Sequence, residues 1–215
     1  MTQKKRVMGI VGSYRKGGMI DTAISEILRA AERDGALVSK VYLLDAHIEY
    51  CKNCRKCMQS PGEKRGECVI DDDMDALLTK IETCDRLVIG APINMGSVNA
   101  LTRTFMERCA GYAYWPWGSP APKLRKKRPD KEAVLVLSSA APAWMGRYLT
   151  GALRTLRQLA RIIGARPIGV LWIDMVNQEE MTLTAKQRAK AGALGRRLTS
   201  RVDGKKWWAI LGSNQ

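Results

Sequence analysis

Apolar residues along the chain gather in short runs that alternate with more polar, periodic segments. Five of the runs are nearly continuous in apolar residues, which is typical of strands that are buried on both faces of a parallel sheet. They cover residues 7–11, 37–44, 86–91, 133–137 and 168–173. The pattern therefore predicts five strands in one parallel sheet.

Between these runs, apolar residues recur at the spacing of an amphipathic helix. The predicted helices cover residues 20–31, 74–81, 98–109, 147–164 and 184–202. We expect Asp73 and Ser97 to be the N-caps of the second and third helices, and Leu149 to lie on the apolar side of the fourth. Strands that alternate with helices predict an α/β fold with helices on both faces of the sheet. Because ligands of such sheets bind beyond the carboxyl ends of the strands, the loops after the first, third and fourth strands are the candidate binding loops.

Composition places the chain among globular proteins of one domain. It has 215 residues, of which 46% are hydrophobic and 27% charged, with a net charge of +15 that favours anionic ligands or partners. We expect one domain over residues 1–203 and a tail over residues 204–215. No apolar run is long enough for a membrane helix, and the polar start of the chain lacks the apolar core of a signal peptide. We therefore expect a cytoplasmic protein, in which cysteines are more often metal-binding, redox-active or buried than disulfide-bonded.

The loop after the first predicted strand has the residues of a phosphate-binding turn. Residues 12–22 contain three glycines and are followed by a helix, whose free N–H groups and dipole attract anions. Ser13 and Thr22 add hydroxyl donors, and Arg15 adds a positive charge. The spacing fits neither a P-loop NTPase nor a dinucleotide fingerprint. We interpret the loop as a phosphate site, the alternative being a turn whose glycines only join strand to helix.

The loops after the third and fourth strands could hold a flat ligand between them. Gly96 allows close backbone approach, and backbone amides together with Asn94 could bind a polar ring edge. Ser138 and Ser139 are small and leave room for a ring. Both loops are equally compatible with ordinary turns.

Four of the six cysteines lie in an irregular segment over residues 45–70. Cys51, Cys54 and Cys57 are separated by two residues each, and Cys68 follows after a gap of ten. Four thiolates suit a [4Fe-4S] cluster or a structural zinc ion, and the alternative is a set of reduced or disulfide-forming thiols without metal. Cys84 and Cys109 lie on apolar helical faces and are expected in the core.

Basic and aromatic residues are concentrated in a loop over residues 112–131, with a further basic group in the tail. The charge could be a solvated face, or it could attract nucleotide phosphates or an acidic redox partner. Nucleic acid is disfavoured because no nucleic-acid-binding motif accompanies the charge. The aromatic stretch 112–117 and Trp144 are interpreted as core or subunit interface, with a cover for the ligand as the alternative.

Together these segments resemble a known family. The Gly12-Ser13-x-Arg15 turn is similar to the FMN-phosphate loop of the flavodoxin-like NAD(P)H-dependent FMN reductases, and residues 91–97 are similar to their loop along the flavin ring. The cysteine segment and the following Asp72-Asp73-Met74 resemble the iron–sulfur flavoprotein branch. The resemblance covers residues 6 to about 175.

This resemblance implies a flavodoxin-like three-layer sandwich that binds FMN, uses NAD(P)H as co-substrate and passes hydride through flavin to a small-molecule or protein acceptor. An electron-carrying iron–sulfur flavoprotein is the alternative. The resemblance also implies a homo-oligomer, either a dimer or a tetramer. The proposed hydride transfer requires no catalytic acid or base from the chain, because the flavin carries the chemistry. The implied phosphate ligands are Ser13, Arg15, Asp21 and Thr22. The implied ring-binding residues are Pro92, Ile93, Asn94, Met95, Gly96, Ser97, Ser138 and Ser139. The implied ligands of a [4Fe-4S] cluster are Cys51, Cys54, Cys57 and Cys68. The acceptor and the choice between NADH and NADPH stay open.

Overall fold

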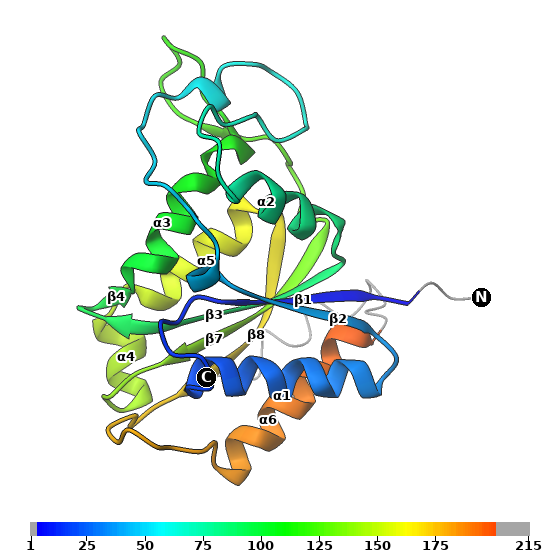
Figure 1. Cartoon of the computed structure of the whole chain (residues 1–215), viewed down its shortest axis with the longest axis vertical. Helices are drawn as coiled ribbons and strands as arrows, with labels where there is room; N and C mark the ends of the chain where they lie inside the picture. The colour runs from blue at the N-terminus through cyan, green and yellow to red at the C-terminus, as the bar shows by residue number, and fades with distance from the viewer. Residues whose placement is uncertain (1–3, 201–215) are drawn as a thin grey trace.

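A computed structural model describes residues 4–200 of the chain, and its centre is a parallel sheet. The sheet has five parallel strands in the order β2-β1-β3-β7-β8, as the sequence pattern predicts (Figure 1). Their bounds are β1 Arg6–Val11, β2 Leu37–Tyr42, β3 Arg86–Asn94, β7 Lys131–Ser138 and β8 Ala165–Ile173. All the carboxyl ends point toward one edge of the molecule, on the left in Figure 1.

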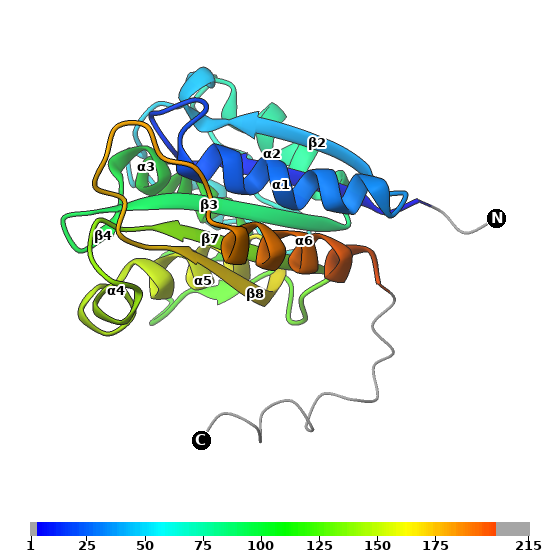
Figure 2. The same ribbon diagram turned by 90° about the horizontal axis from the view of Figure 1, so that it is seen from below.

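Helices cover both faces of the sheet, which makes three layers. The helices are α1 Met19–Arg33, α2 Met74–Thr83, α3 Ala100–Arg108, α4 Ala143–Leu149, α5 Ala152–Ile162 and α6 Ala185–Thr199. Figure 2 shows α1 and α6 side by side on one face, where Val7, Val88 and Val134 join their core cluster. Met8 and Ile89 instead join the cluster of α2, α3 and α5. Successive strand residues thus feed opposite cores, which is why the strands are apolar throughout.

The predicted fourth helix is two helices in the structure. α4 ends at Leu149 and α5 begins at Ala152, with Thr150 and Gly151 between them. The break lets the N–H of Gly151 donate to Gly96 O at 2.8 Å, so it links this helix pair to the loop after β3. The prediction that Leu149 lies on the buried side was wrong, since the residue is 69% exposed.

The segment between β3 and α3 also differs from the prediction. β3 continues to Asn94, turns through Met95 and Gly96 with φ of 48° and 74°, and returns as the short β4 Ser97–Val98. A two-residue turn with both φ positive fits this tight hairpin. Ser97 is therefore not the N-cap of α3. Asn99 takes that position, and its side chain accepts a hydrogen bond from Thr102 N.

Asp73 does occupy the N-cap position of α2, but its side chain makes no capping bond. It accepts from the N–H of His47 instead, while Asp72 accepts from the N–H of Met74. The two carboxylates therefore hold the start of the cysteine segment, at His47 and Glu49, against the start of α2.

Outside the main sheet, short elements organise the two long loops. The cysteine segment carries 3-10 turns at Leu43–Asp45 and Lys56–Met58. The aromatic loop carries a 3-10 turn at Cys109–Tyr112 and a two-stranded ribbon of β5 Ala113–Tyr114 and β6 Lys123–Leu124. The two loops lie together at the top of Figure 1. The predicted tail, residues 204–215, lies outside the described residues, and no helix within residues 4–200 has the length and apolar character needed to span a bilayer.

Candidate functional site

The phosphate-like loop is fixed where β1 ends. The N–H of Gly12 donates to Gly90 O, and Gly12 O accepts from both Asn99 Nδ2 at 2.8 Å and Thr102 Oγ1 at 3.1 Å. A Cβ atom at Gly12 would lie 2.2 Å from Thr102 Oγ1, so this glycine is required by close packing. The N-cap of α3 therefore holds the loop after β1 in place.

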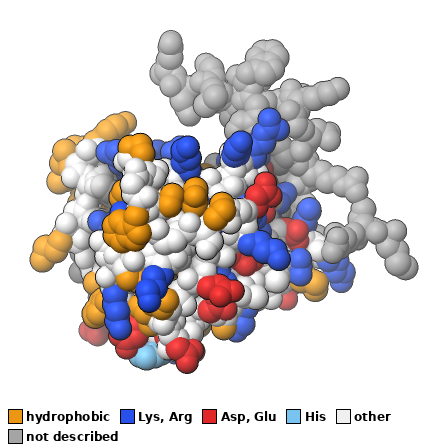
Figure 3. Space-filling view, turned by 90° about the horizontal axis from the view of Figure 1, so that it is seen from above, with side chains coloured by type: hydrophobic (Ala, Val, Ile, Leu, Met, Phe, Trp, Pro, Cys, Tyr) orange, Lys and Arg blue, Asp and Glu red, His pale blue; other side chains and the backbone are white. Residues whose placement is uncertain are grey.

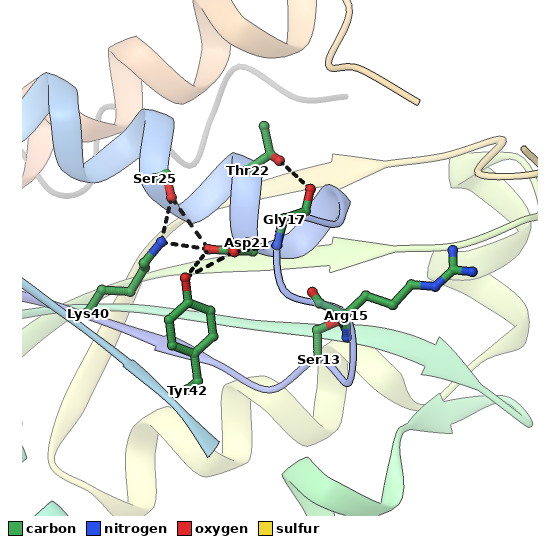
Figure 4. Close-up of polar contacts among 8 residues, drawn as sticks. All are labelled: Ser13, Arg15, Gly17, Asp21, Thr22, Ser25, Lys40 and Tyr42. Atoms are coloured by element: carbon green, nitrogen blue, oxygen red, sulfur yellow. Dashed lines mark hydrogen bonds and ion pairs between the residues drawn. The ribbon is translucent and has the colours of Figure 1, made fainter. Parts of the chain in front are cut away.

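Asp21 holds the other end of the same loop. Its carboxylate accepts the N–H of Gly17 at 2.7 Å and Lys40 Nζ at 2.7 Å, and the hydroxyl of Tyr42 at 3.1 Å (Figure 4). Burial by itself would raise the pKa of Asp21, but the hydrogen bonds from Lys40 and Gly17 lower it below its usual value. Thr22 also bonds to Gly17, since its Oγ1 donates to Gly17 O at 3.1 Å. Asp21 and Thr22 thus contact the loop from behind.

The middle of the loop keeps donors for a ligand. Within residues 4–200, the backbone N–H groups of Ser13, Tyr14 and Lys16 have no hydrogen-bond acceptor. Ser13 Oγ accepts from the N–H of Arg15, which curls the loop. The Arg15 side chain points away from the Asp21 cluster in Figure 4, and its guanidinium forms no ion pair with a described residue. Free amides beside a cation that forms no ion pair with the described residues are the chemistry of an anion site.

A cleft of about 970 Å³ opens in front of this loop, at the carboxyl edge of the sheet. Seven of the twelve predicted cofactor-binding residues line this cleft. The predicted residues that line the cleft are Ser13, Arg15, Pro92, Ile93, Asn94, Ser138 and Ser139. The predicted residues outside that lining are Asp21, Thr22, Met95, Gly96 and Ser97. Met95, Gly96 and Ser97 lie outside the cleft because they form the tip of the β3–β4 hairpin. The tip points out to solvent, and Met95 is fully exposed.

The sequence analysis missed one wall of the cleft. Residues 178–182, in the loop between β8 and α6, also line it. The fifth strand ends at the same sheet edge as the others, so the loop after it was a candidate by the same argument. Its composition gave no further signal, since Gln178, Glu179 and Glu180 are not residues that attract a phosphate.

The four predicted cluster ligands line a second cavity. Cys51, Cys54, Cys57 and Cys68 surround a space of about 350 Å³ and form no disulfide. Burial raises the pKa of the Cys57 thiol, and the neighbouring Cys68, Cys51 and Cys54 raise it further. Yet within residues 4–200 no three Cys, His or acidic side chains come close enough to hold a single metal ion. Four thiols around a roomy cavity fit a cluster better than a mononuclear ion.

Arginines hold the irregular segment that carries these cysteines. The guanidinium carbon of Arg55 lies 3.6 Å from the ring centre of Trp115 and 4.1 Å from that of Trp117. Arg125 was predicted within an exposed basic run, but it is buried. It donates to four backbone oxygens of the two loops, namely Cys57 O, Ser60 O, Gly62 O and Gly111 O. The solvated-face interpretation is therefore wrong for this residue.

The other two cysteines are buried, and the aromatic residues of the sequence prediction do not line the cleft. Cys84 and Cys109 are buried, which confirms that they belong to the core. Tyr112 is buried, whereas Trp115 and Trp117 contact Arg55 and do not line the cleft. Trp144 is exposed on α4 and lies outside the lining of the cleft as well.

Comparison with known proteins agrees with this geometry. The family model described as NADPH-dependent FMN reductase matches residues 5–173, which include every strand of the main sheet. The chain belongs to the NADPH-dependent FMN reductase family. The match ends with β8, so the cleft walls formed by β1, β3 and β7 all lie inside the family region.

Within this family, iron–sulfur flavoproteins are among its curated relatives. One from Archaeoglobus fulgidus is 33% identical over 111 residues, which are 52% of this chain and 48% of that protein. One from Methanocaldococcus jannaschii is 31% identical over 103 residues, which are 48% of this chain and 51% of that protein. The chain spans about half the length of the curated relatives it matches.

Solved structures of other proteins share the fold. The structure of an NAD(P)H:quinone oxidoreductase from Methanothermobacter marburgensis superposes with a TM-score of 0.70. It covers 91% of this chain and 100% of its own, at 13% sequence identity. At that identity the likeness concerns the fold, and it confirms the predicted flavodoxin-like sandwich.

Proposed function

We propose that this chain is an FMN-dependent oxidoreductase that uses NAD(P)H and binds FMN in the cleft at the carboxyl edge of the sheet. The observation that carries the proposal is the loop after β1, whose unpaired amides and free Arg15 guanidinium face that cleft. When bound, FMN supplies the redox chemistry, because its N5 accepts a hydride from a reduced nicotinamide and the flavin then reduces an acceptor.

The chain's own residues would bind and orient the cofactor. The N–H groups of Ser13, Tyr14 and Lys16 would hold the phosphate together with Arg15, while Asp21 and Thr22 would fix the loop through Gly17. The ring would lie beside the end of β3 and the small side chains after β7. Ser139 supports that wall, since its Oγ accepts from Trp172 Nε1 at 3.0 Å and donates to Ala141 O at 2.8 Å.

The test compares FMN with riboflavin, which differs only in lacking the phosphate. We expect wild-type protein to bind FMN far more tightly than riboflavin. Arg15→Ala should weaken FMN binding about 10- to 100-fold, because one charge-assisted hydrogen bond contributes about 1.5–3 kcal/mol, and it should leave riboflavin binding unchanged. Quenching of flavin fluorescence measures both affinities. Arg29→Ala is the matched control, since Arg29 is exposed farther along α1 and pairs with Glu26.

Two results would contradict the proposal. One is equal binding of FMN and riboflavin by the wild-type protein. The other is an Arg15→Ala protein that binds FMN as tightly as the Arg29→Ala control. Either result would mean that the phosphate is not held at the loop after β1.

A second candidate function is favoured by the cavity of four thiols. We propose that Cys51, Cys54, Cys57 and Cys68 bind a [4Fe-4S] cluster, so that the chain also serves as an electron carrier. The free state of all four cysteines and their common cavity support this. A bound cluster supplies one-electron exchange, whereas the flavin also handles hydride.

Iron and sulfide analysis of anaerobically purified protein tests the cluster. We expect about four of each per chain if the site is full. Cys57→Ser should lose most of the iron. Cys84→Ser should retain it, because Cys84 is buried elsewhere in the core. Iron-free wild-type protein, or equal iron in both variants, would rule out this cluster while leaving the flavin proposal intact.

The surface also supports the proposal of a homo-oligomer, either a dimer or a tetramer. Trp144, Tyr148 and Leu149 of α4 are all more than half exposed, and so is Met95 at the tip of the hairpin that Gly151 contacts. Figure 3 looks onto the end of the molecule with the cysteine segment, where further hydrophobic side chains gather between basic ones. A second copy of the chain is the partner that we propose for the α4 face. A monomeric mass in analytical ultracentrifugation would contradict this.

A further inference from the structure

Arg108, the last residue of α3, is buried next to Cys68, one of the four cysteines that line the cysteine cavity. Its side chain is 1% exposed, as is that of Asp72, with which it pairs. The two groups meet through two contacts, Nη1 to Asp72 Oδ2 at 2.5 Å and Nη2 to Asp72 Oδ1 at 3.0 Å. Arg108 Nη1 also donates to Glu49 O at 2.8 Å. The residue thus joins the two ends of the cysteine segment to α3.

The same guanidinium also contacts one of the thiols. Arg108 Nη2 donates to Cys68 Sγ at 3.6 Å, which is a normal length for a hydrogen bond to sulfur. The Nε–H group is buried and has no acceptor among the described residues. Arg108, Cys57 and Cys68 also line a small void. A buried cation with one donor on a sulfur and a second donor unpaired is more than the packing of a helix end requires.

Asp72 keeps Arg108 in this orientation. Its two carboxylate oxygens accept both guanidinium contacts, and they also accept the N–H groups of Glu49 and Met74. Burial by itself would raise the pKa of Asp72, but the bonds from Arg108 and from these amides lower it below its usual value. The carboxylate is therefore ionised at neutral pH, and its two-point contact leaves Nη2 facing Cys68.

We propose that Arg108 raises the reduction potential of the [4Fe-4S] cluster by donating a hydrogen bond to the sulfur of Cys68, and that Asp72 is its positioning residue. This inference rests on the cluster proposed above. Reduction adds one electron to the cluster from an external donor, with no bond made or broken and no proton moved. Since the added electron increases the negative charge on the ligand sulfurs, a cationic donor stabilises the reduced form more than the oxidised form.

The other arginines near the cavity do not take this role. Arg65 pairs with Asp75 and Glu82, Arg55 stacks between two tryptophan rings, and Arg125 donates to backbone oxygens. Among residues 4–200, Arg108 is the arginine whose guanidinium donates a hydrogen bond to a cysteine sulfur of the cavity. Its removal should therefore change the potential in a way that the removal of a nearby charge does not.

The experiment is a redox titration of anaerobically purified protein, with the EPR signal of the reduced cluster as readout and dithionite as reductant. Arg108→Gln should lower the equilibrium constant for reduction about tenfold, which corresponds to about 59 mV for one electron. Arg108→Lys should give a smaller decrease, because an ammonium group keeps the charge but cannot bind Asp72 at two points and reach Cys68 as well. Asp72→Glu keeps the negative charge but displaces the carboxylate that orients Arg108, so it should lower the potential as well.

Arg103→Gln is the matched control. Arg103 lies on the same helix, is half exposed and pairs with Glu107, so its loss removes the same charge without touching a cysteine. We expect this variant to keep the wild-type cluster potential, and all variants to keep the wild-type flavin potential. If Arg108→Gln does not fold, Arg108→Lys and Asp72→Glu decide the question, because both keep the net charge and both should lower the potential.

The possible outcomes distinguish failure of the Arg108 role from failure of the cluster proposal on which it rests. A wild-type protein without iron and sulfide would overturn the cluster and, with it, the role of Arg108. A cluster that is present and keeps its potential in the Arg108 and Asp72 variants would overturn the role of Arg108 alone. Equal shifts in Arg108→Gln and Arg103→Gln would also overturn it, because they would show an effect of net charge and not of the hydrogen bond.

Discussion

The loop after β1 and the cysteine segment are both candidate binding sites, but they are held in different ways. The loop after β1 is fixed mainly through its backbone, since Gly12 and Gly17 receive or donate the bonds that shape it. The cysteine segment contains little regular structure and is fixed by buried arginine side chains, above all Arg108 and Arg125. A site at a sheet edge can use strand ends and helix caps, whereas a long loop needs side chains that cross-link it.

The comparison predicts that the cysteine segment depends most on single side chains. Asp72→Ala should lower the free energy of unfolding by about 3–5 kcal/mol, because it leaves the Arg108 cation buried without a partner. Urea unfolding followed by circular dichroism measures the change. The neighbouring Asp71→Ala, at an exposed position, should change it little. A small effect of Asp72→Ala would mean that the pair does not organise this segment.

The loop after β1 should instead be sensitive to its backbone. Gly12→Ala forces a Cβ into the 2.2 Å contact with Thr102 and should cost about 2 kcal/mol of stability while weakening FMN binding. Thermal unfolding and flavin titration measure the two effects. Gly192→Ala in α6 is the control, because its Cβ would meet nothing closer than 3.5 Å and should be neutral or slightly stabilising. Equal stability and equal FMN affinity of the Gly12→Ala and Gly192→Ala proteins would show that the loop after β1 does not depend on the close packing at Gly12.

Asp21 is the charged side chain that the loop after β1 does use, and its contribution depends on pH. Because its pKa is lowered in the folded protein, the stability it provides is present above the unfolded pKa of about 4 and is lost as the pH falls through the folded value. Asp21→Asn should cost about 1.5 kcal/mol at pH 7 and progressively less below about pH 4. Urea titrations at several pH values measure this. A cost that does not change with pH would show that the charge is not involved.

The smallest effect is expected at the rim of the cysteine segment. Trp117→Ala removes one of the two rings stacked on Arg55, and an exposed cation–π contact contributes about 0.5–1 kcal/mol. Trp144→Ala is the control, because Trp144 is similarly exposed but lies on α4, away from Arg55. Comparison of the urea midpoints measures the difference. A loss as large as that from Asp72→Ala would place the main support of the segment at its surface.

The sequence was most informative where local pattern decides the structure. Continuous apolar runs located all five strands, and the glycine-rich turn with Ser13 and Arg15 located the loop that borders the cleft. The spacing of the four cysteines predicted their convergence on one cavity. In each case the pattern lies within one short stretch of the sequence, so the prediction did not depend on knowing the tertiary contacts.

Long-range contacts account for what the sequence did not reveal. The break between α4 and α5 depends on a bond from Gly151 to Gly96, and Asn99 became the cap of α3 because the chain first forms a hairpin. The roles of Arg108 and Arg125 depend on partners more than 30 residues away in the sequence. The basic run over residues 112–131 looks like a solvated surface until the fold brings backbone carbonyls to one of its members, Arg125.

A crystal structure of the protein grown with FMN tests the proposed phosphate site at the loop after β1. We expect the phosphate to lie within hydrogen-bond distance of the N–H groups of Ser13, Tyr14 and Lys16, with the ring beside Pro92 to Asn94. An FMN phosphate bound at any other place, with the loop after β1 empty, would contradict it.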